Sequence, residues 1–383
     1  MQRAKSSRVF KLTLEMYAPA KQVVLTNTKN KIQLNDLLQE GISNSEFCAR
    51  ATQNHNLTIV GASDVPVEIV KGEKSNRSDL LSSHEEADVL IAKHAISSSQ
   101  SGKSIRVVSD DTDVIVLLVH FYNSKCATSN SAPMIMSSPV QERAVIDIRA
   151  TAEKHSDIAH DLLAIHGLSW ADTVASYHGI GKASVLKVAQ KGKYPLSEIG
   201  DRNADIAQVE AQATQFMCAA YGKESCASMI ECRVKLWRSK TGKSGASSVK
   251  LSSLPPTTSA FIENVHRCHF QVAIWKAALL ESPPDMDPAS FGWEYDHQRI
   301  LVPQTVPPGT LSAPSYILEL IRCNCKSSGC RTAVCSCSKI GCTIFCSCEG
   351  GEGCMNPLTK KQNEVQEDES TPEDKDEEEP LTN

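Results

Sequence analysis

The chain has 383 residues, of which 41% are hydrophobic and 22% are charged, and its formal net charge is −5. This composition is typical of a globular protein with two or three domains and excludes collagen-like, coiled-coil and wholly disordered chains. No apolar run approaches the roughly 18 residues that a membrane span needs. No apolar segment follows the first five residues, as a secretory signal requires. We therefore expect an intracellular protein without a membrane partner.

The charge is distributed unevenly. Residues 364–383 contain ten acidic residues and one lysine, a charge of −9, so residues 1–363 carry +4. A run of like charge without aromatic residues cannot bury a core, which predicts a disordered acidic tail over 358–383. This acidic tail either has a function of its own or is simply a solubilising extension. The mildly basic remainder is compatible with approach to phosphates.

Hydrophobic periodicity predicts a mixture of helices and strands along the chain. Helices are expected over 31–41, 83–95, 152–168 and from 182 to 189, and strands over 9–16, 57–60, 65–70, 105–109 and 114–121. The last of these is apolar apart from one histidine, as a buried strand would be. The Ser-, Pro- and Met-rich segment 124–141 predicts a surface insertion, 196–280 a helical extension, and 281–320 a proline-rich connector.

Acidic residues recur in three short motifs, at 83–88, 109–113 and 170–172. The first begins a predicted helix, the second follows a predicted strand, and the third precedes a glycine turn. Sites in open α/β sheets form beyond the carboxyl ends of the strands. Carboxylates from separate segments converge mainly to hold hard cations, and two such ions about 4 Å apart promote phosphodiester cleavage. The motifs therefore predict a site for Mg²⁺ or Mn²⁺.

The candidate ligands are Glu86, Asp111, Asp113 and Asp172, with Asp88 or Asp110 assisting. Each motif has a simpler interpretation. Ser83 and Glu86 have the spacing of a capping box, which alone explains that glutamate. The aspartates at 110–113 fit a solvated acidic turn, and the one at 172 fits a helix cap.

A glycine turn follows the third acidic motif. Gly179, Ile180 and Gly181 lead into a predicted helix that starts at Lys182. Free backbone amides at a helix N-terminus attract phosphate, so Gly179, Gly181 and Lys182 are candidate DNA contacts. The alternative is a plain turn.

In order and spacing, these motifs resemble the PIN-like 5′-nuclease fold of flap endonucleases. Glu86 matches a glutamate of the family's helix motif, Asp111 and Asp113 match its strand-end pair, and Asp172 matches its last metal ligand. The glycine turn matches its helix-hairpin-helix. The resemblance implies an α/β fold, with a PIN-like (Rossmann-like) parallel sheet and flanking helices, over residues 1–195.

The chain departs from this family at two places. His84 occupies the position of the first helix glutamate, and residues 1–30 offer only Glu15 where the family has two further aspartates. The resemblance therefore implies a nuclease-type domain that is incomplete at its N-terminus. We expect its catalysis to be lost or severely weakened.

The cysteines provide the most specific pattern. Nine of the fifteen lie within 32 residues: Cys323, Cys325, Cys330, Cys335, Cys337, Cys342, Cys346, Cys348 and Cys354. Three Zn²⁺ ions with tetrahedral sulfur coordination need twelve bonds, which nine thiolates supply when three of them bridge two metals each. The alternatives are a disulfide knot or a non-specific Cys-rich tail. An odd cysteine total and the absence of a signal peptide disfavour the knot.

The spacing resembles the tesmin/TSO1-like CXC zinc domain, over residues 321–357. That resemblance implies minor-groove DNA binding and a nuclear location, with Lys326, Arg331 and Lys339 as candidate phosphate contacts. A nuclease-like region followed by a CXC domain is also similar to transposon-associated animal proteins.

Three hypotheses follow. The first is a zinc-binding, DNA-binding protein on a degenerate, transposon-derived PIN-like fold. The second is an active, divalent-metal-dependent, structure-specific 5′-nuclease. The third is an interaction scaffold that binds protein and no nucleic acid. The sequence does not identify a protein partner.

Overall fold

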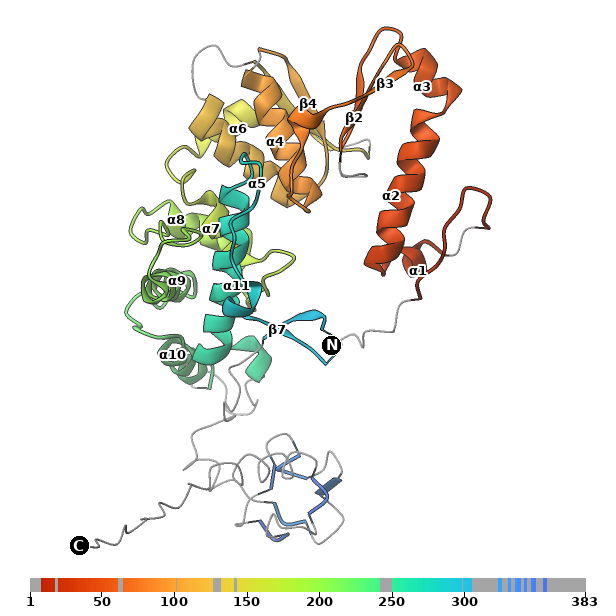
Figure 1. Ribbon diagram of the computed structural model, residues 1–383. Helices are drawn as coiled ribbons and strands as arrows, with labels where there is room; N and C mark the ends of the chain where they lie inside the picture. The colour runs from red at the N-terminus through yellow and green to blue at the C-terminus, as the bar shows by residue number, and fades with distance from the viewer. Residues whose placement is uncertain are drawn as a thin grey trace, which may run out of the picture. The chain divides into compact units, whose positions relative to one another are not determined.

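The computed structural model describes residues 8–17, 20–60, 65–100, 102–126, 132–140, 143–241, 250–297 and 299–304, and short runs around the C-terminal cysteines. The chain divides into two compact units, Met1–Thr305 and Val306–Asn383. The first is a mixed α/β unit with small sheets and many helices (Figure 1). No described helix is long and apolar enough to cross a membrane.

The N-terminal part of the first unit consists of a helical segment followed by an antiparallel sheet. It contains α1 (Lys21–Leu25), α2 (Thr28–Ser43), α3 (Glu46–Ala51), β1 (Leu57–Ile59), β2 (Val67–Val70) and β3 (Glu73–Asn76). The predicted helix 31–41 and the two strands between 57 and 70 are confirmed. The strand expected over 9–16 does not form. There, the amides of Phe10 and Leu12 instead donate to side chains of α2, Asn30 Oδ1 at 2.9 Å and Gln33 Oε1 at 3.0 Å.

A second small sheet follows, in the order β4 (Ile105–Val108), β5 (Met134–Ser137), β6 (Ile146–Asp147). β4 and β5 are parallel, whereas β5 and β6 are antiparallel. The expected parallel sheet is thus reduced, in the described part of the chain, to one parallel pair. β5 lies within the segment 124–141 that we expected to be a surface insertion. Its Met134 and Met136 are buried, because the strand is central in the sheet and carries apolar side chains.

The expected buried strand over 114–121 is wrong: these residues form most of α5 (Thr112–Phe121). Asp111 caps this helix, since its side chain accepts from the amide of Asp113 at 2.9 Å. A short apolar run fits a buried helix as well as a buried strand, so periodicity alone does not separate them. Here the Asp-Thr-Asp cap before the run decides for the helix.

The remaining helices differ from expectation mainly at their ends. They are α4 (Ala87–Gln100), α6 (Ile148–Lys154), α7 (Leu162–Ser169), α8 (Lys182–Ala189), α9 (Ile206–Ala220), α10 (Met229–Thr241) and α11 (Thr258–Lys276). Short 3-10 turns cover Ser78–Leu80, Leu251–Ser253 and Pro288–Ser290, and a π turn covers Tyr122–Cys126. α4 starts four residues later than predicted. The helix expected over 152–168 is two helices, because the chain turns between 155 and 161.

The core is centred on α7, whose eight residues are all buried and which packs along α11 (Figure 1). A Cβ on Gly167 would lie 2.8 Å from Cys268 Sγ, so glycine permits this close approach. Part of the expected proline-rich connector also belongs to this unit, as the hairpin of β7 (Trp293–Tyr295) and β8 (Leu301–Pro303). Arg267 of α11 holds the hairpin by donating to the carbonyl oxygens of Gly292 at 2.8 Å and Gln304 at 2.6 Å.

Candidate metal centres

Carboxylates from two of the three acidic motifs meet at the junction of α4 and α5. Asp88 lies in the first turn of α4, Asp111 caps α5, and Asp113 lies in the first turn of α5. One carboxylate oxygen from each of the three lies within 4.8 Å of the others. Glu86 and Asp172 are near enough for their charges to act on Asp88. We call Asp88, Asp111 and Asp113 the carboxylate cluster; Glu86 and Asp172 act on it through their charges.

The surroundings of Asp88 and Glu86 alter the protonation of these two carboxylates. Burial, followed by the charges of Asp111 and Asp113, raises the pKa of Asp88 from 3.8 to about 6. Burial also raises the pKa of Glu86, although hydrogen bonds from two side chains of α11 oppose that shift. Asp88 and Asp113 are half-buried and Asp111 is exposed. Converging carboxylates repel each other, and a bound divalent cation would remove that cost. The donor set therefore fits a hard cation with oxygen ligands.

Glu86 is not engaged in a capping box. Its two oxygens accept from Gln271 Nε2 at 2.8 Å and from Trp275 Nε1 at 3.2 Å. Gln271 Oε1 in turn accepts from the hydroxyl of Thr173 at 2.9 Å, and Thr173 directly follows Asp172. α11 therefore connects the first acidic motif to the third.

Asp110, named as an assisting ligand, faces other groups. One of its oxygens lies 3.1 Å from Nη1 of Arg143, and the other accepts from the hydroxyl of Ser138 at 2.9 Å. This carboxylate is already paired. Asp88 fills the assisting position instead.

His166 is a member of this site that sequence reasoning missed. It is buried in α7, and its Nε2 lies 2.7 Å from Asp113 Oδ1. A single histidine within the apolar run 162–168 was the available signal, but such a residue is more often part of a core. Because α7 approaches α5 closely, His166 instead contacts the carboxylate of Asp113.

Lys182, predicted as a DNA contact, points into the protein. Its amino group lies 2.9 Å from Nδ1 of His166 and donates to the carbonyl oxygens of His166 and Trp170. Burial lowers the pKa of Lys182 to about 8, while the charge of Asp113 opposes that shift. The lysine therefore still carries its proton at neutral pH. Gly179, with a φ of 76°, and Gly181 form the expected exposed turn before α8.

The second unit contains the other centre, which we call the thiol cluster. All nine cysteines lie in the described part of this unit, none of them forms a disulfide, and seven of them are buried. Sulfur–sulfur distances include 3.9 Å from Cys323 to Cys330, 3.8 Å from Cys323 to Cys342, and 3.6 Å from Cys337 to Cys346. Two thiolates on one tetrahedral Zn²⁺ lie about 3.8 Å apart, whereas a disulfide needs about 2 Å. The spacing therefore fits zinc.

The thiols form overlapping sets of four, in each of which the sulfurs lie within 4.8 Å of one another. The sets are Cys323, Cys342, Cys346 and Cys348; Cys323, Cys330, Cys335 and Cys342; and Cys330, Cys342, Cys348 and Cys354. Cys342 belongs to all three. Burial raises the pKa of Cys337 to about 12, so without a cation its thiol stays protonated. Zinc binds thiolates, which makes such a cluster favourable only when it is metallated.

Two further residues border the thiol cluster. Asn356 is fully buried and donates to the carbonyl oxygen of Cys337 at 2.7 Å and to Cys342 Sγ at 3.6 Å. Arg331 directly follows Cys330 and is exposed. The other two predicted phosphate contacts, Lys326 and Lys339, lie outside the described residues.

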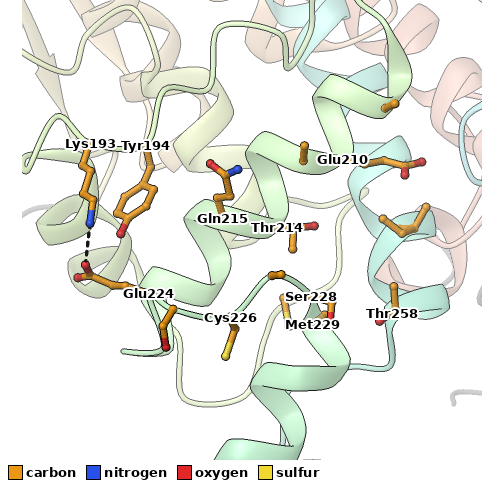
Figure 2. Close-up of a pocket in the computed structure, with 15 residues that line it drawn as sticks. Lys193, Tyr194, Glu210, Thr214, Gln215, Glu224, Cys226, Ser228, Met229 and Thr258 are labelled. Carbon is orange, nitrogen blue, oxygen red and sulfur yellow. Dashed lines mark hydrogen bonds and ion pairs between the residues drawn. The ribbon is translucent and has the colours of Figure 1, made fainter.

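A cavity of about 640 Å³ lies elsewhere, between α9 and the first turns of α10 and α11 (Figure 2). Its charged side chains are paired: Lys193 lies 3.3 Å from Glu224, and Glu210 lies 2.8 Å from His266. Among the described residues that line it, none belongs to the acidic motifs or the thiol cluster. This cavity therefore belongs to neither of the two clusters.

Comparisons with protein-family models, with curated proteins and with solved structures found no match to this chain. The functional argument accordingly depends on the two clusters themselves.

Proposed function

We propose that the chain is a zinc-binding protein whose thiol cluster holds about three Zn²⁺ ions and presents a DNA-binding surface. The observation that carries this proposal is the clustering of the thiols at zinc-like spacing, with seven of the nine in the three four-sulfur sets. Cys323, Cys330 and Cys348 each belong to two of the four-sulfur sets, and Cys342 belongs to all three. Shared sulfurs are what bridging coordination requires when nine thiolates supply twelve bonds.

Charge and exposure support DNA as the partner. Nine thiolates with three zinc ions carry a net −3, so a DNA-facing surface needs cationic side chains around the cluster. Arg331 is exposed beside Cys330, where it would act as a sequence-independent phosphate contact. Residues 1–363 also carry +4. Together with the CXC-like spacing, these features favour a nuclear DNA-binding protein of transposon origin, with the nuclease-like first unit as a platform.

Fluorescence anisotropy with a labelled DNA duplex, measured in a salt series on the zinc-loaded full chain, tests this proposal. Because phosphate contacts release counterions, we expect affinity to fall steeply with salt, and Arg331→Ala to reduce that slope by about one. Cys342→Ser should remove binding, while Cys48→Ser, a buried thiol outside the cluster, should leave it unchanged. DNA binding that survives complete zinc removal would contradict the proposal.

A second function is favoured by one specific observation, the grouping of three carboxylates from two acidic motifs within 4.8 Å of one another. Asp88, Asp111 and Asp113 would hold a divalent cation, and Glu86 and Asp172 would add negative charge. Such a cation supplies electrostatic stabilisation for hydrolysis of a phosphodiester. The resemblance to 5′-nucleases makes flap DNA the substrate to try.

An end-labelled flap substrate incubated with Mg²⁺ or Mn²⁺ separates the two functions. The first proposal expects binding without cleavage. Cleavage that Asp111→Asn abolishes, with DNA affinity unchanged, would establish the second. The exposed Asp36→Asn of α2 is the matched control, because it makes the same chemical change outside the carboxylate cluster.

A further inference from the structure

Three groups from three helices form a continuous chain that ends at the carboxylate cluster. Lys182 begins α8, His166 lies in α7, and Asp113 lies in the first turn of α5. The Lys182 amino group lies 2.9 Å from His166 Nδ1, and His166 Nε2 lies 2.7 Å from Asp113 Oδ1. Both ring nitrogens of this buried histidine are therefore occupied.

The donor count determines how the imidazole is oriented. A lysine ammonium has three donors and no acceptor. Lys182 directs them at His166 Nδ1, at the carbonyl oxygen of His166 at 3.1 Å and at that of Trp170 at 2.6 Å. Nδ1 must then accept, so the ring proton lies on Nε2 and is donated to Asp113. With all three donors used inside the protein, Lys182 has none left for a phosphate.

The surrounding packing holds this chain in place. The ring centroids of Trp275 and His166 lie 5.6 Å apart. The indole Nε1 of Trp275 also donates to Glu86 Oε2 at 3.2 Å. One indole thus contacts the histidine that orients Asp113 and binds the carboxylate of Glu86. Gly167 brings α7 close enough to α11 for this contact.

We propose that Lys182 and His166 are positioning residues: the lysine holds the histidine as its Nε2–H tautomer, and the histidine orients Asp113 as a ligand in the carboxylate cluster. This role replaces the DNA contact predicted for Lys182 from sequence. The inference rests on the proposed cation site. Outer partners of metal ligands typically change metal affinity ten- to a hundredfold when they are removed.

Two measurements on the full chain test the proposal. The first is Mn²⁺ affinity, by titration followed by electron paramagnetic resonance. Lys182→Met keeps the length of the side chain but removes its donors, and we expect it to weaken Mn²⁺ binding by roughly tenfold or more. His166→Gln retains an N–H donor for Asp113 without needing the lysine, so it should bind Mn²⁺ more tightly than His166→Phe. Lys187→Met, an exposed lysine in the same helix, is the control.

The second measurement is the ¹⁵N spectrum of the His166 imidazole, which reports the tautomer whether or not a cation binds. We expect the Nε2–H form in the parent chain and its loss in Lys182→Met. Lys182→Met that keeps the tautomer and the Mn²⁺ affinity but loses DNA affinity would overturn the proposal in favour of a phosphate contact. A parent chain that binds no Mn²⁺ but shows the lysine-dependent tautomer would refute the cation site and the ligand-positioning role, while retaining the Lys182–His166 coupling.

Discussion

Glu86 and Trp275 lie 189 positions apart in the chain, and the indole Nε1 of Trp275 donates to a carboxylate oxygen of Glu86 at 3.2 Å. Gln271 donates to the other oxygen at 2.8 Å. Both oxygens of this half-buried carboxylate therefore have a partner from α11. The hydrogen bonds connect the start of α4 to the helix that packs along the centre of the first unit.

Replacing Glu86 with alanine should destabilise the first unit. The substitution leaves two buried donors without an acceptor, and each such loss costs roughly 1–3 kcal/mol. We expect a fall in the urea midpoint of unfolding, measured by circular dichroism. Glu85→Ala, the exposed neighbouring residue, provides the control; an equal effect in both variants would show that the bonds from α11 contribute nothing.

In the absence of divalent cations, Asp88→Asn should stabilise the folded chain, but only above pH about 4. The pKa of Asp88 rises from 3.8 to about 6 on folding, so the folded state holds this proton more tightly. Below pH about 4 the substitution should change little. Between pH about 4 and 6 the parent chain becomes progressively less stable relative to the variant, and above pH 6 the difference stays constant.

Unfolding midpoints of parent and variant at pH 4, 6 and 8 in the presence of a chelator check this sign. Adding Mn²⁺ at pH 8 should then stabilise the parent chain more than Asp88→Asn. Equal pH profiles for the two proteins would mean that Asp88 does not carry the electrostatic cost of the carboxylate cluster.

Gly167→Ala should separate α7 from α11. The new Cβ would lie 2.8 Å from Cys268 Sγ and 3.1 Å from a methyl group of Val272. Such overpacking costs roughly 1–3 kcal/mol, more than the gain of about 1 kcal/mol that alanine brings to a helix. Thermal unfolding measures the loss. Gly41→Ala in α2, where the Cβ meets only an atom 4.0 Å away, should be neutral or stabilising.

Asn356→Ala should weaken zinc retention. The amide of Asn356 is fully buried and donates to Cys342, the sulfur shared by all three sets, so its removal takes a hydrogen bond from a metal ligand. Loss of such an outer partner typically costs ten- to a hundredfold in metal affinity. Competition with a chromogenic chelator measures this change and also counts the zinc released, which we expect to be three per chain. Unaltered release kinetics in the variant would argue against this role.

The thiol cluster could be predicted from the sequence alone, because all nine cysteines lie within 32 residues and local spacing brings such ligands together. The acidic motifs that supply Asp88, Asp111 and Asp113 could also be found from the sequence, since the first begins a predicted helix and the second follows a predicted strand. Residue type and spacing therefore identified the candidate ligands of both clusters.

The side chains that support the carboxylate cluster could not be predicted from the sequence, because long-range packing brings them there. Its outer partners, Gln271, Trp275 and His166, come from helices that are distant in the sequence from the acidic motifs, and no local pattern marks them. The direction of Lys182 was misjudged for the same reason: a glycine turn before a helix suggests phosphate, but packing of α8 against α7 turns the amino group inward.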